Sequence, residues 1–372
     1  MKRSNHRPGP PCDIQAQTFF IIAYFALSQS HKDEVWICHA IVTVLSRWGP
    51  ILFPYGERNM NRKLSNLVLS SFGALALVGC GGSGGGGNSG PSQVFPSGFY
   101  VSFDSTIKMS YMSDFSGSDW NKQFTPSAIF GIDFDPEGNM IGVNWQNNRL
   151  VKFTNPADLS VYTTLGTQGS GALQFDNPTD VAIDSTGRIY VADAGNQRIV
   201  RMDDFTGAGW TTLDVSSVVT PSSDGMDITI GPDGKIYFSA RLDDIVACAD
   251  DMADTNIEWY GDYINSINDV KLDDEGRIYI VDGAHDRIVR IDDISGAGRV
   301  EFGEVGTGMN QFDGPIAISL DRSGRIYVLD TSNSRICRFD DMTGDNWTTF
   351  GTAGDGVGQF VEDGLADMYF KR

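Results

Sequence analysis

Four aspartates recur at one position of a repeated pattern. They are Asp180, Asp227, Asp269 and Asp367. Carboxylates are the hard oxygen donors that calcium prefers, so a converging set could hold this ion and support metal-assisted hydrolysis. The same carboxylates could instead accept hydrogen bonds from backbone amides of their own repeats. Both interpretations stay open, because Gly131 and Ala317 occupy this position in the two remaining repeats.

Other reactive side chains give little support to catalysis. His285 is the single histidine of residues 98–372 and takes the turn position that Asn196 takes in another repeat, which favours a turn residue over a general base. Cys248 and Cys337 fall on third strands of repeats two apart, beyond the short Cα separation of a disulfide. We expect two core thiols and no disulfide.

The positions of these residues depend on a repeat. The stretch GRIYVADAGNQRIVR (187–201) returns as GRIYIVDGAHDRIVR (276–290) and GRIYVLDTSNSRICR (324–338). Each repeat contains a turn that ends in glycine, at spacings of 42 to 49 residues; these are Gly138, Gly187, Gly234, Gly276 and Gly324. The flanking segments are short and rich in Ile, Val and Tyr. A unit of this length with four strands and no helical period predicts a β-propeller blade.

The two ends of the repeat region complement each other. Residues 365–372 match only the first strand of a unit, and residues 98–124 match only strands two to four. Together they predict a sixth blade, in which the C-terminal strand pairs with the N-terminal strands. This pairing closes the ring and removes its exposed sheet edges. We therefore expect an all-β, six-bladed propeller of four-stranded blades over residues 98–372.

These segments resemble NHL repeats. GRIYVADAGNQRIVR carries the family's glycine, apolar-aromatic strand, Asp, Asn and Arg-Ile, and QFDNPTDVAID and QFDGPIAISLD carry its entry into the first strand. The resemblance covers residues 98–372 and implies a propeller. Two units depart from the pattern. ARLDDIVACADD (240–251) puts Asp244 where Arg198 would be expected, and Asn144 with Trp145 replaces the Asp193 turn. Propeller hydrolases similar to gluconolactonases and paraoxonases hold calcium at a channel mouth, which is the place expected for the four aspartates.

The segment before the repeats looks like an export signal. Residues 60–79 contain Arg62 and Lys63 followed by an apolar stretch, and the sequence LVGC, which ends at Cys80, resembles the lipobox of bacterial lipoproteins. The resemblance implies cleavage before Cys80, acylation of its thiol and, with Gly81 next, sorting to the outer membrane. A plain signal peptide or membrane anchor is the alternative. Residues 80–97 read as a Gly/Ser-rich tether, and residues 1–59 as an over-extended gene start ahead of Met60.

The charge of the chain limits its partners. Residues 80–372 hold 20 Lys and Arg against 44 Asp and Glu, which disfavours nucleic acid. We expect an envelope protein, lipid-anchored through Cys80, whose propeller binds a protein or glycan partner. The alternative is a calcium-dependent, lactonase- or esterase-like hydrolase with its site at the channel mouth.

Overall fold

The computed structural model describes residues 20–29, 36–46, 49–51 and 96–371, except 104–107, 120, 126–127, 156–157, 221–224, 355 and 361–364. The chain forms two units, residues 1–85 and 86–372. In the first unit, β1 (Phe20–Gln29), β2 (Trp36–Ser46) and β3 (Gly49–Ile51) form one antiparallel sheet in that order. The predicted signal peptide, Cys80 and most of the tether lie outside the described residues.

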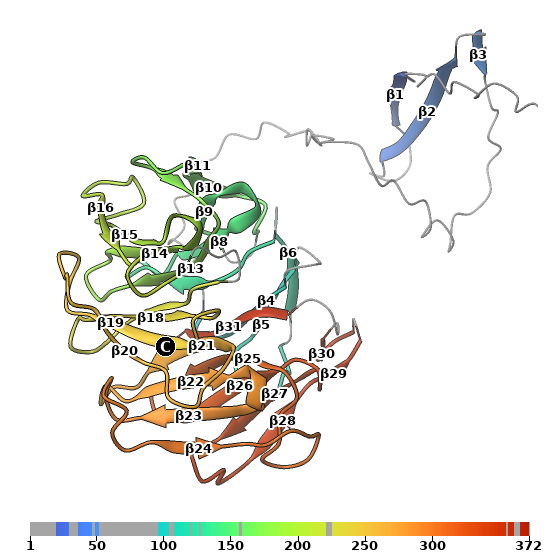
Figure 1. Ribbon diagram of the computed structural model, residues 1–372. Coiled ribbons are helices and arrows are strands. Elements are labelled where there is room, and N and C mark those ends of the chain that lie inside the picture. The colour runs from blue at the N-terminus through green and yellow to red at the C-terminus, as the bar shows by residue number, and fades with distance from the viewer. Residues whose placement is uncertain are drawn as a thin grey trace, which may run out of the picture. The chain divides into compact units, whose positions relative to one another are not determined.

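The second unit contains six four-stranded antiparallel sheets, the blades of a propeller (Figure 1). Blades 2 to 6 each use consecutive strands, in the order first to fourth. Their bounds are β7 (Ile132–Phe134), β8 (Met140–Asn144), β9 (Arg149–Phe153) and β10 (Tyr162–Leu165); β13 (Pro178–Ile183), β14 (Ile189–Asp193), β15 (Arg198–Met202) and β16 (Thr211–Asp214); β17 (Ile228–Ile230), β18 (Ile236–Ala240), β19 (Ile245–Ala249) and β20 (Glu258–Tyr260); β21 (Ile267–Leu272), β22 (Ile278–Asp282), β23 (Arg287–Ile291) and β24 (Val300–Phe302); β25 (Pro315–Leu320), β26 (Ile326–Asp330), β27 (Arg335–Phe339) and β28 (Thr348–Phe350).

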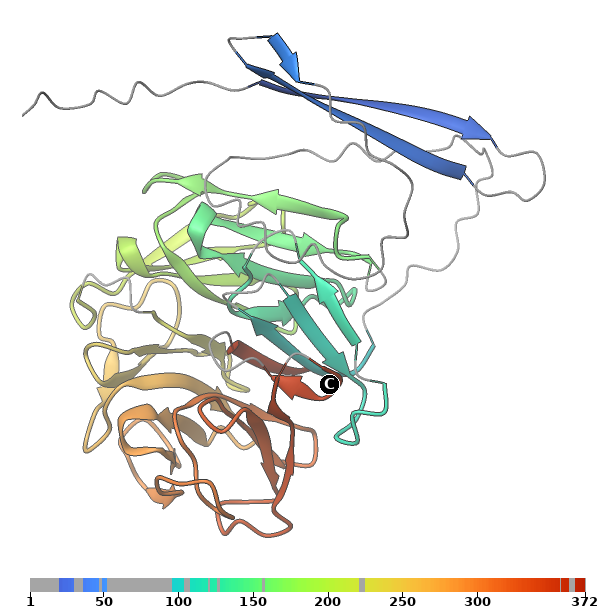
Figure 2. The same cartoon turned by 90° about the vertical axis from the view of Figure 1, so that its right-hand side faces the viewer.

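Blade 1 is built from both ends of the propeller. Its strand order is β31 (Leu365–Lys371), β4 (Gly98–Phe103), β5 (Lys108–Met112) and β6 (Asn121–Phe124). Tyr369 pairs with Tyr100, and Figure 2 shows the C-terminal strand beside the N-terminal strands of the propeller. The six first strands contact one another in a closed cycle, β31–β7–β13–β17–β21–β25. The predicted six-bladed ring, with this mode of closure, is confirmed.

Smaller elements decorate the blade connections. Two parallel pairs, β11 (Thr167–Gln168) with β12 (Gln174–Phe175) and β29 (Thr352–Ala353) with β30 (Gln359–Phe360), precede the first strands of blades 3 and 1. Three 3-10 turns, η1 (Trp145–Asn147), η2 (Ala194–Asn196) and η3 (Gly283–His285), connect second to third strands. Among the described residues, no helix is long and apolar enough to span a membrane.

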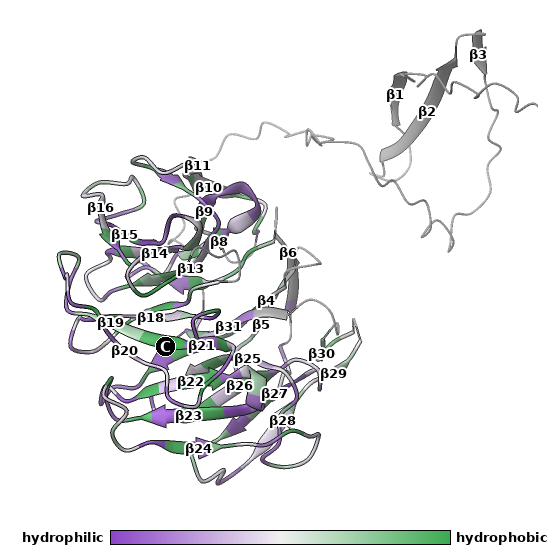
Figure 3. Ribbon diagram, in the orientation of Figure 1, coloured by the Kyte–Doolittle hydropathy of each residue, from purple (hydrophilic) through white to green (hydrophobic). Residues whose placement is uncertain are grey.

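The core lies within and between the blades. All five residues are buried in each of the second strands β8, β14, β18, β22 and β26, because neighbouring blades cover both faces of these strands. Figure 3 shows hydrophobic residues along the blade strands and hydrophilic residues prominent in the turns. The apolar, β-branched composition of the second strands is what this double burial requires.

The turn between first and second strands explains the repeated Asp and Gly. In blade 3, Asp184 Oδ1 accepts hydrogen bonds from the backbone of Thr186 and Arg188 at 2.9 and 3.0 Å, and Gly187 takes a φ of 90°. Asp184 Oδ2 receives Arg188 Nε at 2.6 Å and the Tyr190 hydroxyl at 3.3 Å. One carboxylate therefore organises the whole turn, and the sequence DSTGRIY encodes it.

In three blades, an aspartate–arginine pair ties the end of the second strand to the start of the third strand. Arg198 Nε donates to Asp193 Oδ2 at 2.7 Å, and its guanidinium also donates to the carbonyl oxygens of Ser170 and Gln174 at 2.6 and 2.8 Å. The equivalent pairs are Arg287 with Asp282 and Arg335 with Asp330. Blades 3, 5 and 6 are therefore each held by one such arginine, and these arginines do not converge.

Blade 4 departs from this pattern, but by a different residue than the sequence alignment predicts. Ile245 pairs with Ala240 as Arg198 pairs with Asp193, so Ile245 takes the arginine position. Asp244 lies one residue earlier, where its φ of 55° matches that of the loop residue preceding Arg198. The expectation for Asp244 is wrong by one position, because the left-handed residue that ends the turn is not visible in the amino-acid types.

Candidate binding site at the propeller axis

The four predicted aspartates do meet at the axis. Asp180 and Asp269 are buried, Asp227 and Asp367 are partly buried, and all four lie on or beside first strands. The equivalent position is Gly131 in blade 2 and Ala317 in blade 6, as the alignment predicts. The sequence therefore located this ring of residues correctly.

Three of the aspartates join neighbouring blades. In each, Oδ1 accepts a hydrogen bond from the next residue of its own strand and Oδ2 accepts one from the equivalent residue of the next blade. The two donors are the amides of Val181 and Ile228 for Asp180 (2.8 and 2.9 Å), of Val270 and Ile318 for Asp269 (2.7 and 2.8 Å), and of Met368 and Ile132 for Asp367 (2.7 and 3.3 Å). For these three aspartates the interpretation as backbone caps is confirmed, and each also accepts an amide from the next blade.

Asp227 is held differently. Its Oδ2 receives the hydroxyl of Ser239 at 2.8 Å, within the same blade. The bridging aspartates thus alternate around the ring, in blades 1, 3 and 5. The blades between them carry Gly131, Asp227 and Ala317 at the same position.

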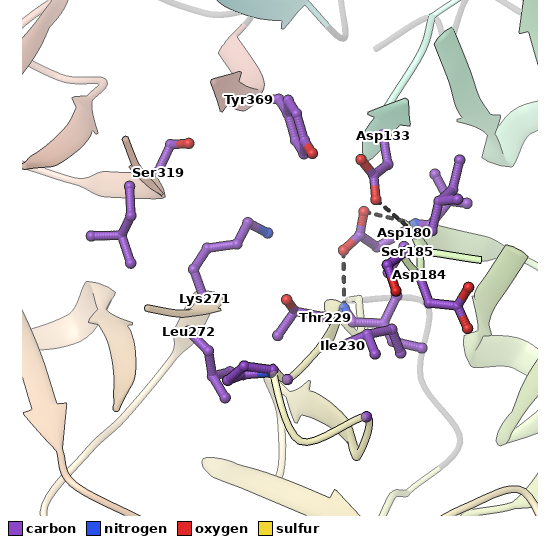
Figure 4. A pocket seen from close by; sticks show the side chains of 18 of the residues that line it. Asp133, Asp180, Asp184, Ser185, Thr229, Ile230, Lys271, Leu272, Ser319 and Tyr369 are labelled. Carbon is purple, nitrogen blue, oxygen red and sulfur yellow. Dashed lines mark hydrogen bonds between the residues drawn. The ribbon is translucent and has the colours of Figure 1, made fainter. Parts of the chain in front are cut away.

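Lys271 supplies the positive charge at this centre. Its Nζ lies 2.8 Å from Asp269 Oδ1, and Figure 4 shows the side chain extending into the space before Asp133, Asp180 and Tyr369. Burial alone would lower the pKa of this ammonium, but attraction by Asp269, Asp180 and the other axial carboxylates raises it well above its ordinary value. Lys271 is therefore held in its charged form.

A second ring of side chains lies two residues further along the first strands. Asp133, Ala182, Thr229, Lys271, Ser319 and Tyr369 occupy it. Asp133 repeats the bridging pattern, since it accepts the amides of Phe134 and Ile183 at 2.6 Å each. Ser319 Oγ accepts the amide of Phe370 at 3.0 Å. Sequence analysis missed this ring, although a lysine and an aspartate inside otherwise apolar strands are its signal.

Five axial carboxyl groups surround the single ammonium. Burial raises the pKa of Asp133 and Asp367 to about 6 and that of Asp227 to about 8. Burial also raises the pKa of Asp180 well above its ordinary value, and Asp227 and Asp367 raise it further. The centre therefore contains carboxyl groups that keep a proton near neutral pH and that a further cation would help to ionise.

A cavity of about 520 Å³ opens above this centre. The second ring and Asp180 form its inner wall, and the first-to-second-strand turns of blades 3, 4 and 5 form its rim. Two rim carboxylates are paired, Asp184 with Arg188 and Asp273 with Arg277, both at 2.6 Å. In blade 4 the corresponding residue is Gly231, so this part of the rim has no carboxylate–arginine pair.

The aspartates do not fit a calcium site. Asp180, Asp269 and Asp367 each direct both oxygens at backbone amides, and the ammonium of Lys271 occupies the space beside Asp269. Calcium needs six to eight oxygens that converge at 2.3–2.6 Å. Within the part of the propeller that the structure describes, no three His, Cys, Asp or Glu side chains are placed to hold a metal ion.

The remaining candidates have structural roles. His285 Nδ1 lies 2.8 Å from Asp282 Oδ1 in the loop that begins blade 5's third strand, and Asn196 makes the same contact with Asp193 at 2.9 Å. His285 is thus a turn residue, as predicted. Cys248 and Cys337 are buried free thiols on β19 and β27, in agreement with the expectation that they form no disulfide.

The fold and its axial site define a six-bladed β-propeller. The family model for the NHL repeat matches residues 175–202 and 312–339, which correspond to the first three strands of blades 3 and 6. These two segments of the chain are NHL repeats. The chain is 36% identical over 99 residues to human NHL repeat-containing protein 3, covering 26% of each chain. It is 32% identical over 124 residues to the mouse protein of that name, covering 32% of this chain and 33% of that one.

The chain thus spans about a quarter to a third of the length of these curated relatives. Solved structures are similar at a lower level. Virginiamycin B lyase from Staphylococcus aureus has a TM-score of 0.49 at 12% identity, with 70% of this chain and 86% of that chain covered. An auxiliary nutrient binding protein from Bacteroides thetaiotaomicron has a TM-score of 0.47 at 16% identity, with 64% and 67% covered. At this level neither protein's function transfers to this chain.

Proposed function

We propose that the protein is a binding module whose axial cavity receives a small polar ligand, or the polar end of a larger protein or glycan partner. The observation that carries this proposal is the cavity of about 520 Å³ at the axis, within the size range of ligand pockets. Lys271, Asp133 and Tyr369 place polar groups on its inner wall. A concave site with a few convergent polar groups is the usual form of a binding site.

The rigidity of this wall supports binding. The side chains project from first strands that are bonded to each other across the blades, as Asp133 is to Ile183 in the next blade. Functional groups on strands of a closed ring keep their positions better than groups on loops. The ligand therefore meets a preorganised site.

The binding proposal is tested with a library of polar metabolites, by thermal shift followed by calorimetry. Wild type is compared with Thr229→Trp, which fills the cavity wall in blade 4. We expect saturable binding to wild type and its loss in the folded variant. If no member of the library binds wild type, or if Thr229→Trp binds as wild type does, the proposal is overturned.

The hydrolase alternative has its own measurement. Calcium is titrated into chelator-treated protein by calorimetry, with Asp180→Ala and Asp269→Ala beside wild type. We expect no tight site. One calcium per chain, lost in both variants, would replace the binding module with a calcium-dependent hydrolase.

We further propose that the propeller is attached to the cell envelope by a lipid on Cys80. The lipobox-like sequence LVGC and the glycine-rich segment after it support this proposal. Expression of the full chain and of Cys80→Ala in a Gram-negative host tests it. We expect the wild type in the outer-membrane fraction, with an acylated N-terminal peptide beginning at residue 80, and the variant in the soluble fraction. Equal distribution of the two proteins would refute the anchor.

A further inference from the structure

We propose that the ligand of the axial cavity carries a primary ammonium group, which binds between Asp133 and Asp180 opposite Lys271. This inference rests on the proposed binding function and names the chemistry of the ligand. It is carried by the geometry of the cavity wall and by the balance of charges around it. Neither follows from the NHL-repeat pattern, because Lys271 and Asp133 have no counterparts at their positions in the other blades.

Carboxyl groups outnumber ammonium groups around the cavity. Asp133 on β7, Asp180 on β13, Asp227 beside β17, Asp269 on β21 and Asp367 on β31 face the axis. Lys271 on β21 is the one cation among the described residues that interacts with them. Its ammonium is already engaged by Asp269 at 2.8 Å. An anionic ligand would disfavour the ionised form of these carboxyl groups, whereas a cationic ligand would favour it and be stabilised by the carboxylates that result.

The rim does not reverse this balance. Arg188 and Arg277 are the basic groups of the turns of blades 3 and 5, and each is bonded to the aspartate of its own turn at 2.6 Å. In blade 4, Lys235 is bonded to Asp250 at 2.6 Å. These cations are thus matched by their own carboxylates.

The cavity wall can satisfy an ammonium where it cannot satisfy calcium. Asp133 and Asp180 are each less than one tenth exposed, yet both line the cavity. Each of their oxygens that accepts one amide has a second lone pair, of which the Tyr369 hydroxyl uses one on Asp133. The side chains of Thr229, Ser319 and Tyr369 surround the same space. An ammonium needs three acceptors at ordinary hydrogen-bond distance, and it does not require six oxygens to converge on one point.

The pH dependence of binding gives an independent signature. A bound cation favours the ionised form of Asp133, Asp227, Asp367 and Asp180, whose pKa values burial raises. Binding therefore releases protons, and affinity rises between about pH 5.5 and pH 8.5. Lys271 stays protonated over this range, because the axial carboxylates raise its pKa well above the ordinary value.

The experiment uses probes of matched length and different charge. Calorimetry on the full chain compares 1,5-diaminopentane with 1,5-pentanediol and glutarate. Glucosamine is compared with N-acetylglucosamine, which separates an amino sugar from a free diamine as the source of the ammonium. We expect at least one amine probe to bind tenfold or more tightly than its uncharged partner. Repeating that titration in buffers of different ionisation enthalpy should show proton release.

Three variants test the location. Asp133→Asn should lower the affinity for the amine probe at least tenfold. Asp203→Asn, which removes one exposed carboxylate outside the cavity, should leave this affinity unchanged. Lys271→Met should bind the amine at least as well as wild type. Because substitutions at the axis can unfold the ring, Thr229→Lys and Thr229→Gln form a second pair. The two new side chains fill a similar volume. Thr229→Lys should lower the affinity for the amine probe at least tenfold more than Thr229→Gln does.

The outcomes separate this inference from the binding proposal. If pentanediol, glutarate or N-acetylglucosamine binds more strongly than its amine partner, or if Lys271→Met loses binding, the proposal of an ammonium ligand is overturned. A binding module of another specificity would then remain. Equal effects of Thr229→Lys and Thr229→Gln would overturn the proposal of an ammonium ligand in the same way. Failure of every probe and of the wider polar library would overturn the binding module itself.

Discussion

Gly131 leaves the space that the carboxyl group of Asp180 fills. A β-carbon built on Gly131 would overlap Asp180 Oδ1 and come within 2.8 Å of Asp180 Cα. Asp180 uses that position to bridge blades 3 and 4, through the amide of Ile228 at 2.9 Å. The absence of a side chain in one blade is therefore a condition for the contact between the next two.

Gly131→Ala should lower the free energy of unfolding by about 1–3 kcal/mol, the usual cost of inserting a methyl group into a packed core. Urea denaturation measures it. Gly171→Ala is the control, because a β-carbon there would meet only the terminal amide of Gln174, at 2.9 Å and beyond. If both variants lose the same stability, the overlap with Asp180 is not the cause.

The stability of the propeller should fall as pH rises from about 5 to about 8. Burial raises the pKa of Asp133 and Asp367 to about 6 and that of Asp227 to about 8, from 3.8. The folded state then binds more protons than the unfolded state, so the stability these groups contribute is complete below pH 3.8 and is lost through their folded pKa values. Urea unfolding at several pH values measures the slope.

Asp227→Asn isolates one contribution to that slope. The amide cannot ionise and can still accept the hydroxyl of Ser239, so the variant should lose less stability than wild type between about pH 7 and pH 8. A wild-type stability that increases over pH 5 to 8, or a variant with an unchanged slope, would contradict the raised pKa values of the axial carboxyl groups.

Arg198→Lys should detach the loop of residues 169–175 from blade 3. The guanidinium makes hydrogen bonds to Asp193, Ser170 and Gln174 at 2.6–2.8 Å, and a lysine cannot reach all three. We expect a loss of about 1.5–3 kcal/mol and faster hydrogen exchange in this loop. Arg201→Lys is the control, because the Arg201 guanidinium lies 3.7 Å from Asp203 Oδ1 and makes only a weak ion pair. Its free energy of unfolding should change by no more than about 0.5 kcal/mol.

The two core thiols should be unreactive in the folded protein. Burial raises the pKa of Cys248 to about 11 and that of Cys337 further, so neither forms thiolate near neutral pH. Iodoacetamide labelling at about pH 8, followed by peptide mapping, should modify them only in urea. Labelling of Cys337 in native buffer would show that blade 6 opens locally.

The repeat explains why the fold was predictable. Turn glycines such as Gly187 and pairs such as Asp193 with Arg198 are local in sequence and recur in several blades. The pattern of one unit therefore predicts the strands and turns of the others. Aligning the units also placed the four axial aspartates correctly. The match of residues 365–371 to a missing first strand extended the same logic to ring closure.

The chemistry of the axis was less predictable, because it depends on residues that do not recur. The position that Lys271 and Asp133 occupy holds a different residue in every blade. Comparison of the repeats finds shared residues, so it does not detect a residue that occurs in one blade only. Asp269 looked like a metal ligand until Lys271 was found 2.8 Å from it. The backbone amide of Ile228, which comes from another blade, was likewise invisible as a partner of Asp180.

Ring closure also sets an order in time. β4 is the first strand of the propeller to leave the ribosome, and its partner β31 is the last. Blades 2 to 6 can form as they are synthesised, but β4 keeps an unpaired edge until β31 has been synthesised. A chain that stops before β31 therefore contains five complete blades and cannot close the ring.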